Sequence, residues 1–279
     1  MTRVVLPRTL AELWEEFAKA PQGLVFAGGT DLFVRLRSAA TPPATLIGLE
    51  RLDELRGVEE AGDTLRLGAA TPVADLAATP ALRRDFPVLC RGLESMGGPA
   101  LRNMATLGGN LCTASPAGDS LPPLTVLDAT VVLLSCRGER TLPIGEFLVA
   151  PGRSALRPGE VVGSVLLAKP AGETKQFFEK VGRRRANAIA VASLAFVARI
   201  SAGGDWTEVR CAYGSVGPTV VRAREVESIL TGPPPDPDRI ARAQQAARRA
   251  VCPIDDLRAS AEYRRAVAGN LLYRLLDPP

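Results

Sequence analysis

The sequence contains no histidine. This absence excludes chemistry that needs an imidazole, including Ser-His-Asp and Cys-His nucleophile activation and the HExxH zinc site. Cysteine is sparse as well, because the five residues Cys90, Cys112, Cys136, Cys211 and Cys252 lie at least 22 positions apart and form no CxxC pair. We therefore expect no local zinc or iron–sulfur site, and we interpret the cysteines as scattered reduced thiols.

Long apolar runs are also missing. No stretch reaches the roughly 18 apolar residues that a membrane-spanning helix requires, and the N-terminal residues lack the apolar core and cleavage site of a secretory signal. With 46% hydrophobic and 23% charged residues, the 279-residue chain is typical of a globular protein of one to three domains. These features predict a cytoplasmic protein without a membrane span.

Lysine is rare, since only four of the 34 lysines and arginines are lysines, and the formal net charge is +4. The densest basic run, Arg183 to Arg185, is too short and too poor in neighbouring aromatic residues to form a nucleic-acid platform. We interpret it first as a solvated charge run. Docking of a protein partner or a pyridine nucleotide is the alternative.

The N-terminal third predicts a small lobe of the βαβ type. Thr9 and Glu12 have the spacing of a capping box, and apolar residues then recur at the spacing of one helix face. Asp31 follows an apolar run and two glycines, where it can cap a helix. The expected elements are a helix over 9–19, a strand at 24–27, a short helix that begins at Asp31 and a strand at 45–49.

The next part of the chain predicts a second lobe. Thr71-Pro72 has the pattern of an N-cap followed by proline at the first helical position. Residues 96–120 are rich in Gly, Ser, Thr and Asn without clear periodicity, and such a long stretch inside a compact protein is usually functional or disordered. The expected elements are a strand at 64–70, a helix after Thr71, a helix over 87–95, a hairpin of 131–136 and 140–144, and a strand at 161–168.

The last third predicts an antiparallel sheet followed by helices. Val209, Cys211 and Tyr213 alternate with more polar positions, which indicates a sheet buried on one face. A proline-rich connector then precedes a helix at about 238–250, and a final helix begins at Ser260. No repeat of 20 to 50 residues is evident, which argues against solenoids and propellers.

Two glycine segments stand out, Ala27 to Asp31 and Thr106 to Asn110. Nucleotide phosphates bind backbone N–H groups that no Cβ obstructs, and each segment can supply such a nest. Two nests suit a pyrophosphate, although a single strand–Gly-Gly–helix turn is more often plain turn chemistry. The chain has neither GxGxxG nor GxxxxGK[ST], so the Rossmann and P-loop sites are excluded.

Four blocks of the sequence carry a family resemblance: AGGTDLFVRLR (27–37), RNMATLGGNLCTASPAGD (102–119), FFEKVGRRRANAIAV (177–191) and CPIDDLRASAEYRR (252–265). In order and spacing they resemble the FAD-binding medium subunit of the molybdenum hydroxylases, the family of xanthine dehydrogenase and aerobic carbon monoxide dehydrogenase. The resemblance covers nearly the whole chain.

The resemblance implies an α+β protein. A two-lobed FAD-binding fold of the vanillyl-alcohol oxidase type is expected over residues 1–170, with lobes at 1–55 and 56–170. A C-terminal domain of the carbon monoxide dehydrogenase flavoprotein type, an antiparallel sheet with helices, is expected over 171–279. In this family the two glycine segments hold the pyrophosphate and ribityl chain of FAD.

Carried over by position, the resemblance implies FAD contacts from both glycine segments and from three further places. Asp119 matches the aspartate that ends the second loop, Val161 and Val162 match the apolar pair beside the flavin ring, and Lys180 matches the lysine that approaches the flavin. The glycine segments contribute Phe26, Ala27, Gly28, Gly29, Thr30, Asp31, Leu32, Thr106, Gly108, Gly109, Asn110 and Thr113. The same resemblance implies no catalytic acid or base and no metal ligand in this chain.

Some positions have a plainer interpretation or depart from the family. Lys180 also fits a surface lysine, Asp119 a helix cap for 120–128, and Cys112 a packing residue. The family commonly has a glutamine where this chain has Pro99-Ala100, so the resemblance implies no glutamine contact there. Met96 stands where some members have an aromatic residue beside the flavin.

The implied function is that of an electron-transfer subunit carrying noncovalent FAD. Electrons would come from the [2Fe–2S] clusters of a small partner subunit, fed by a molybdenum cofactor on a large one, and would leave to NAD, a quinone or oxygen. Two alternatives remain: a self-contained flavin reductase of the same fold, and a non-catalytic assembly subunit.

Overall fold

The computed structural model describes residues 2–184 and 187–276 and groups the chain into two compact units. Unit 1 comprises Met1–Thr79, Gly98–Ala114 and Ala129–Leu167; unit 2 comprises Pro80–Gly97, Ser115–Asp128 and Ala168–Pro279. Arg185, the last residue of the basic run, lies outside the described residues. The domain boundaries expected at 55/56 and 170/171 divide the chain into continuous segments. The two units are defined by spatial contacts and combine discontinuous segments, so the expected boundaries stay a prediction.

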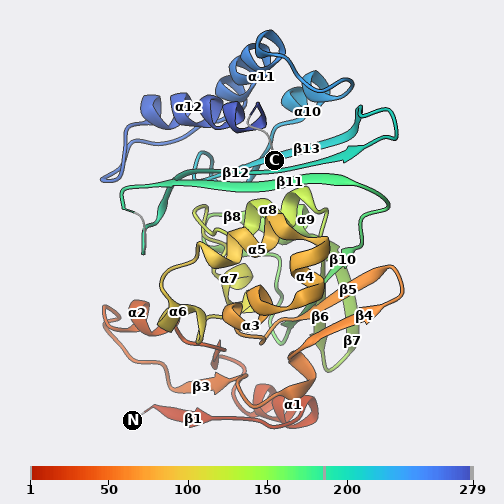
Figure 1. The fold of residues 1–279 in the computed structure, drawn as a ribbon. Helices are drawn as coiled ribbons and strands as arrows, with labels where there is room; N and C mark the ends of the chain where they lie inside the picture. The colour runs from red at the N-terminus through yellow and green to blue at the C-terminus, as the bar shows by residue number, and fades with distance from the viewer. Residues whose placement is uncertain (1, 185–186, 277–279) are drawn as a thin grey trace. The chain divides into compact units, whose positions relative to one another are not determined.

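Unit 1 contains two main sheets (Figure 1). The first is a three-stranded parallel sheet in the order β1-β3-β2, and the second is five-stranded in the order β4-β5-β10-β6-β7. Its elements are β1 (Arg3–Val5), α1 (Leu10–Lys19), β2 (Leu24–Phe26), α2 (Leu32–Leu36), β3 (Thr45–Gly48), η1 (Asp53–Leu55), β4 (Val58–Ala61), β5 (Thr64–Gly68), α3 (Val73–Ala78), α6 (Pro99–Arg102), α7 (Leu107–Thr113), β6 (Thr130–Ser135), β7 (Gly138–Pro143), α9 (Ile144–Phe147), β8 (Leu148–Ala150), β9 (Arg153–Ser154) and β10 (Val161–Ala168).

Helix α1 confirms the expected helix over 9–19. The Thr9 hydroxyl accepts a hydrogen bond from the Glu12 N–H, as in a capping box. The Glu12 carboxylate, however, accepts from the N–H of Arg8 rather than from that of Thr9. The apolar face of the helix packs with Leu13, Trp14 and Phe17 in a core that also includes Ile47 of β3.

Two local predictions need correction, and one strand of unit 1 was missed. Pro72, not Thr71, is the N-cap of α3, and the Thr71 hydroxyl donates to the Gly57 carbonyl instead. Residues 96–120 are not structureless, because they contain α6, α7 and the turn before α8. Strand β1 was not predicted at all, since three mostly exposed residues carry no periodic signal.

Unit 2 is built around one antiparallel sheet in the order β11-β12-β13-β14. Helices α10, α11 and α12 cover one face, and α5 and α8 pack on the other (Figure 1). Its elements are α4 (Pro80–Asp85), α5 (Pro87–Glu94), α8 (Leu121–Val126), β11 (Thr174–Gly182), β12 (Ala190–Ile200), β13 (Trp206–Gly214), β14 (Val221–Arg222), α10 (Arg224–Leu230), α11 (Pro237–Ala250), α12 (Ala261–Asn270) and η2 (Leu271–Leu275).

The expected antiparallel sheet is confirmed, but the expectation of one buried face is wrong. Val209, Cys211 and Tyr213 face the core under α10–α12, whereas Ala212 belongs to a second buried cluster with Val88 of α5 and Val126 of α8. Both faces are covered because α5 and α8, from the middle of the chain, pack on the face that the sequence pattern predicted to be exposed.

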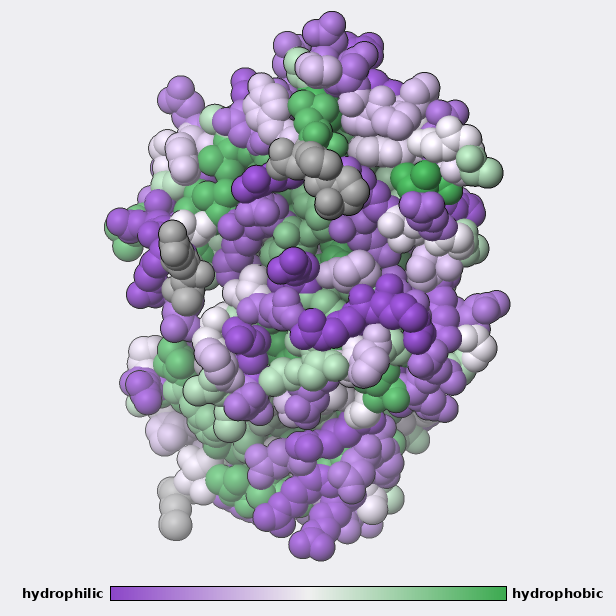
Figure 2. All heavy atoms as spheres, in the orientation of Figure 1, coloured by the Kyte–Doolittle hydropathy of each residue, from purple (hydrophilic) through white to green (hydrophobic). Residues whose placement is uncertain are grey.

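On the molecular face shown in Figure 2, hydrophilic side chains predominate and apolar ones form separate patches.

Candidate functional site

The first glycine segment is a turn between β2 and α2 that the fold itself requires. A Cβ on Gly28 would lie 1.7 Å from the carbonyl oxygen of Met104, so the two backbones are in direct contact. Gly29 has φ +70°, a left-handed conformation that side chains with a Cβ rarely adopt. Both glycines therefore have a structural reason within unit 1.

Backbone N–H groups in this turn are available to a ligand. Among the described residues we find no acceptor for the N–H groups of residues 28–32, while the Gly29 carbonyl accepts from the Phe33 N–H at 3.0 Å. Consecutive unpaired N–H groups form a concave anion site when they converge. The turn thus has the donors that a phosphate group needs.

The second glycine segment forms the start of α7, which Thr106 caps. The Thr106 hydroxyl accepts from the N–H of Gly109 at 3.1 Å, and the N–H of Gly108 donates to the Ala69 carbonyl at 2.8 Å. These two N–H groups already have partners within the protein, so they are not free donors, and the FAD contacts expected from this segment stay a prediction. Gly108 is needed for packing instead, because a Cβ there would lie 2.7 Å from the Cβ of Ala69.

Gly109 differs from the other three glycines. It is exposed and helical, and a Cβ added to it would meet only the Thr106 hydroxyl oxygen, at 3.0 Å. No other described residue lies close enough to demand glycine here, and alanine would favour the helix. The chain keeps an open space over Gly109 that a Cβ would partly fill.

The structure brings the two segments together within unit 1, although they are far apart in the sequence. The Thr113 hydroxyl bridges them, because it lies 3.3 Å from a carboxylate oxygen of Asp31 and 3.0 Å from the Gly109 carbonyl. Asp31 also pairs with Arg35 at 2.9 Å. Its side chain makes no cap hydrogen bond to α2, so the expected capping role of Asp31 is wrong.

Val161 and Val162 lie at the start of β10 and are both buried, with 2% and 3% of their surface exposed. Val161 packs in the core with Leu13 and Ile47. Two hydrogen bonds connect this strand to α7, because the Ala69 N–H donates to the Gly163 carbonyl and the Ala69 carbonyl accepts from Gly108. The structure therefore joins the valine pair to the second glycine segment through Ala69.

Asp119 and Lys180 form a buried ion pair in unit 2. Their charged groups are 2.5 Å apart, and the Lys180 ammonium also donates to the Ser95 carbonyl at 2.9 Å. The other carboxylate oxygen of Asp119 is buried without a hydrogen-bond partner in the described part of the chain. Burial raises the pKa of Asp119 to about 6, although the adjacent ammonium opposes the rise.

Two of the simpler interpretations of this pair are wrong. Lys180 is not a surface lysine, since only 11% of its side chain is exposed. Asp119 does not cap α8, because Ser120 occupies the N-cap position and no side-chain cap bond forms there. Lys180 lies on β11 opposite Ser193 of β12, so the sheet fixes its position.

Sequence patterns did not reveal the residues that shape the glycine segments. Backbone atoms of Met104 lie against Gly28, and the Cβ and carbonyl group of Ala69 lie against Gly108. The ring of Phe33 lies against Gly29. In the sequence, the glycines were the one indication that other residues approach closely at these positions. Among the described residues, no group of three His, Cys, Asp or Glu side chains could hold a metal ion.

Comparison with known families gives a direct match along the chain. Residues 1–170 match the FAD binding domain in molybdopterin dehydrogenase, and residues 177–278 match the CO dehydrogenase flavoprotein C-terminal domain. The chain belongs to the FAD-binding subunits of the molybdenum hydroxylases. The family resemblance and the α+β fold inferred from the sequence are thereby confirmed.

Individual relatives agree with this assignment. The chain is 32% identical over 258 residues to a putative xanthine dehydrogenase FAD-binding subunit of Escherichia coli (strain K12), covering 92% of this chain and 88% of the relative. It is 31% identical over 254 residues to the carbon monoxide dehydrogenase medium chain of Hydrogenophaga pseudoflava, covering 91% and 88%.

A solved structure of carbon monoxide dehydrogenase from Hydrogenophaga pseudoflava superposes with a TM-score of 0.93 at 29% identity, covering 99% of this chain and 96% of that one. This molybdenum hydroxylase FAD subunit is therefore part of an oxidoreductase. None of its described helices is both long and apolar enough to cross a membrane.

Proposed function

We propose that this subunit binds FAD noncovalently, with the diphosphate on the turn at residues 28–32. Gly109 is the observation that carries the proposal, because among the described residues a Cβ added there would meet only the Thr106 hydroxyl oxygen, at 3.0 Å. The unpaired N–H groups of the turn supply donors for a dianionic diphosphate. The absence of histidine removes the residue most often used for covalent flavin attachment.

The remaining site residues have distinct proposed roles. Thr113 and Asp31 hold the two glycine segments in register through their hydrogen bond. Val161 and Val162, which are both buried, are the proposed apolar pair beside the flavin ring. Asp119 and Lys180 are proposed FAD contacts as well, supported by the buried carboxylate oxygen of Asp119 that lacks a partner among the described residues. The proposed contacts also include Phe26, Ala27, Thr30, Leu32 and Asn110, which belong to or directly flank the two segments.

Bound FAD supplies the redox chemistry, since a flavin can accept and release electrons singly or in pairs. The protein positions the cofactor and controls access to it, and no side chain is assigned as a proton donor or acceptor. The two family domains cover almost the whole chain, and the described residues contain no metal-ligand cluster. The proposed function assigns any metal-centred step to other chains.

We further propose that the subunit takes electrons from the [2Fe–2S] clusters of a small partner and passes them to an external acceptor. A large partner with the molybdenum cofactor would oxidise the substrate. The similar chain of Hydrogenophaga pseudoflava is a medium chain by name, which supports assembly with small and large subunits. All five cysteines are free thiols, which supports a cytoplasmic site of action.

Visible spectroscopy tests the cofactor assignment. The purified subunit supplied with FAD should show a flavin spectrum, and denaturation should release the yellow colour into the supernatant. Colour that stays with the precipitate, or no binding by the folded protein, contradicts noncovalent FAD.

Reduction experiments test the electron-transfer role. Substrate should bleach the flavin only when the small and large subunits are present. Bleaching of the isolated subunit by a small substrate would instead identify a self-contained reductase. A complex that forms without FAD would identify an assembly subunit.

A further inference from the structure

The loop between α11 and α12 is held in place by an extensive set of polar contacts. The Asp256 carboxylate accepts from the Arg258 N–H at 2.8 Å and pairs with the Arg258 and Arg264 guanidinium groups at 2.8 and 2.5 Å. Arg264 is only 2% exposed and also donates to the Ser215 carbonyl at 2.9 Å. Asp255 accepts from the Ala261 N–H at 2.7 Å. The loop is therefore fixed to the core of unit 2.

This fixed loop presents apolar side chains to solvent. Leu257 is 97% exposed and Ile254 is 71% exposed, and Tyr263 in the first turn of α12 is 53% exposed. Burying a leucine side chain is worth about 1.5–3 kcal/mol. The polar contacts of the loop hold Leu257 in a position where no described residue buries its side chain.

A second segment supports the loop from the side. The Arg183 guanidinium donates to the Leu257 carbonyl at 3.0 Å, which ties the connection after β11 to the loop before α12. Both connections lie at the same end of the sheet in Figure 1. Ile189 follows in the β11–β12 connection and is 61% exposed. Exposed apolar residues thus occur on two loops that hydrogen-bond to each other.

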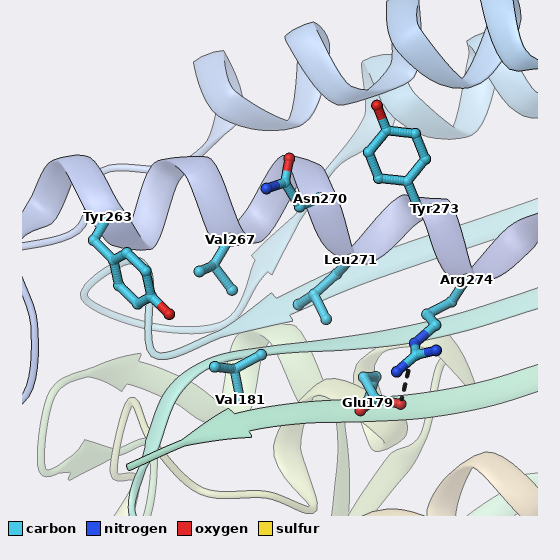
Figure 3. A pocket seen from close by; sticks show the side chains of 8 residues that line it. All are labelled: Glu179, Val181, Tyr263, Val267, Asn270, Leu271, Tyr273 and Arg274. Atoms are coloured by element: carbon cyan, nitrogen blue, oxygen red, sulfur yellow. Dashed lines mark ion pairs between the residues drawn. The ribbon is translucent and has the colours of Figure 1, made fainter.

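A groove adjoins this end of the sheet. Figure 3 shows it running from Tyr263 along α12 and η2 toward Arg274, with Val181 of β11 on the opposite side. Its volume is about 400 Å³, and Val267 and Leu271 contribute apolar lining. Glu179 and Arg274 pair at 3.9 Å at the far end. Tyr263, one of the exposed residues, also lines this groove.

We propose that Leu257, Ile254, Ile189, Tyr263 and the adjoining groove form the docking surface for a partner subunit of the hydroxylase. The partner would present an apolar socket for Leu257 with carboxylates around it. This inference rests on the proposed function, because it assumes the heteromeric complex.

Charge favours such a partner over a second copy of this chain. Residues 183–184 and 252–265 contain five arginines and three acidic residues, a net charge of +2. Two copies meeting at a two-fold axis would bring equal positive charges together. An acidic partner surface is attracted instead, and the attraction weakens as salt screens it.

Exposed-residue variants of the full subunit test the surface. We expect Leu257→Ala to weaken binding to one partner subunit about 10- to 100-fold, as loss of a buried leucine predicts, and Leu257→Glu and Tyr263→Glu to weaken it further. Val149→Glu is the matched control, because Val149 is 49% exposed and lies in unit 1. It should bind as the wild type does, and the dissociation constant of the wild type should rise with salt.

The measurements are biolayer interferometry with purified small and large subunits, the FAD content of each variant, and the mass of the isolated subunit by light scattering. All variants should keep their FAD and circular dichroism spectrum. If the wild type binds a partner and Leu257→Glu binds equally well, the docking surface is wrong while the proposed function survives. If the wild type binds neither subunit, both fail. Dimerisation of the isolated subunit that Leu257→Glu abolishes overturns the proposal in favour of self-association.

Discussion

Replacing Gly109 with alanine tests whether glycine is needed at this position for the fold or for FAD binding. The added Cβ would meet only the Thr106 hydroxyl oxygen, at 3.0 Å, and a small shift of that side chain relieves the contact. By contrast, a Cβ on Gly28 would lie 1.7 Å from the Met104 carbonyl oxygen, which is backbone and cannot move away. Gly28→Ala should therefore disrupt the turn itself.

The expected magnitudes have opposite signs for stability and for FAD binding. Glycine in a helix interior is less favourable than alanine by roughly 0.5–1 kcal/mol, so Gly109→Ala should leave the free energy of unfolding of the apoprotein unchanged or raise it by at most about 1 kcal/mol. A methyl group forced into a close-packed contact costs about 1–3 kcal/mol. FAD affinity should therefore fall about 5- to 150-fold.

Gly145→Ala provides the matched control. Gly145 lies in α9, is also exposed and helical, and a Cβ there meets nothing within 4 Å. Urea unfolding of the apoproteins and titration with FAD, followed by flavin fluorescence, give the two quantities. If Gly109→Ala and Gly145→Ala bind FAD equally well, the cofactor does not approach Gly109 and the reasoning is refuted.

Three further predictions concern stability. Burial raises the pKa of Asp119 from 3.8 to about 6 in the folded chain, so the folded state holds a proton that the unfolded state releases in this interval. As the pH rises from about 4 to about 6, the free energy of unfolding of the wild type should fall relative to that of Asp119→Asn. Above this interval the two free energies should change in parallel. Urea midpoints of the two proteins that change in parallel over the whole pH range would contradict this. Arg264→Met should lower the free energy of unfolding by about 1.5–3 kcal/mol, because the charged hydrogen bonds of a buried guanidinium are lost; chemical denaturation measures the loss, and a change within 0.5 kcal/mol would be evidence against the anchoring role. Thr9→Ala should cost about 1 kcal/mol, because the Glu12 N–H loses its cap, and Thr9→Ser should restore it; equal melting curves for both variants would be inconsistent with the cap.

Elements with local signals were predictable from the sequence. Helix α1 has its N-cap, acidic first turn and apolar face within eleven residues, and the structure confirms it. The strands of the unit 2 sheet follow each other along the chain, so their antiparallel pairing needs only short connections. Strand β1 was missed because its partner, β3, pairs with it across more than forty residues.

The glycine segments were partly predictable. Their positions and the family resemblance identified them, yet the sequence could not tell which N–H groups stay available. Gly108 and Gly109 both donate to groups of the protein, Gly108 to a carbonyl from another part of the chain, whereas residues 28–32 keep their N–H groups unpaired within the described structure. The formation of the short helix α7 also depends on tertiary contacts. Its two glycines lower its intrinsic helix propensity, and packing against Ala69 compensates.

What the sequence alone determined are the local and compositional properties: the exclusion of imidazole chemistry, the caps, the strand alternation and the glycine blocks that mark the family. Only the tertiary structure decided that Asp31 bonds to Thr113, 82 positions away, rather than capping α2. It alone decided that Lys180 is buried against Asp119 and that Leu257 stands in solvent. The physical reason is that exposure and hydrogen-bond partnership depend on which distant segments pack together, whereas propensity and periodicity depend on neighbours in the chain.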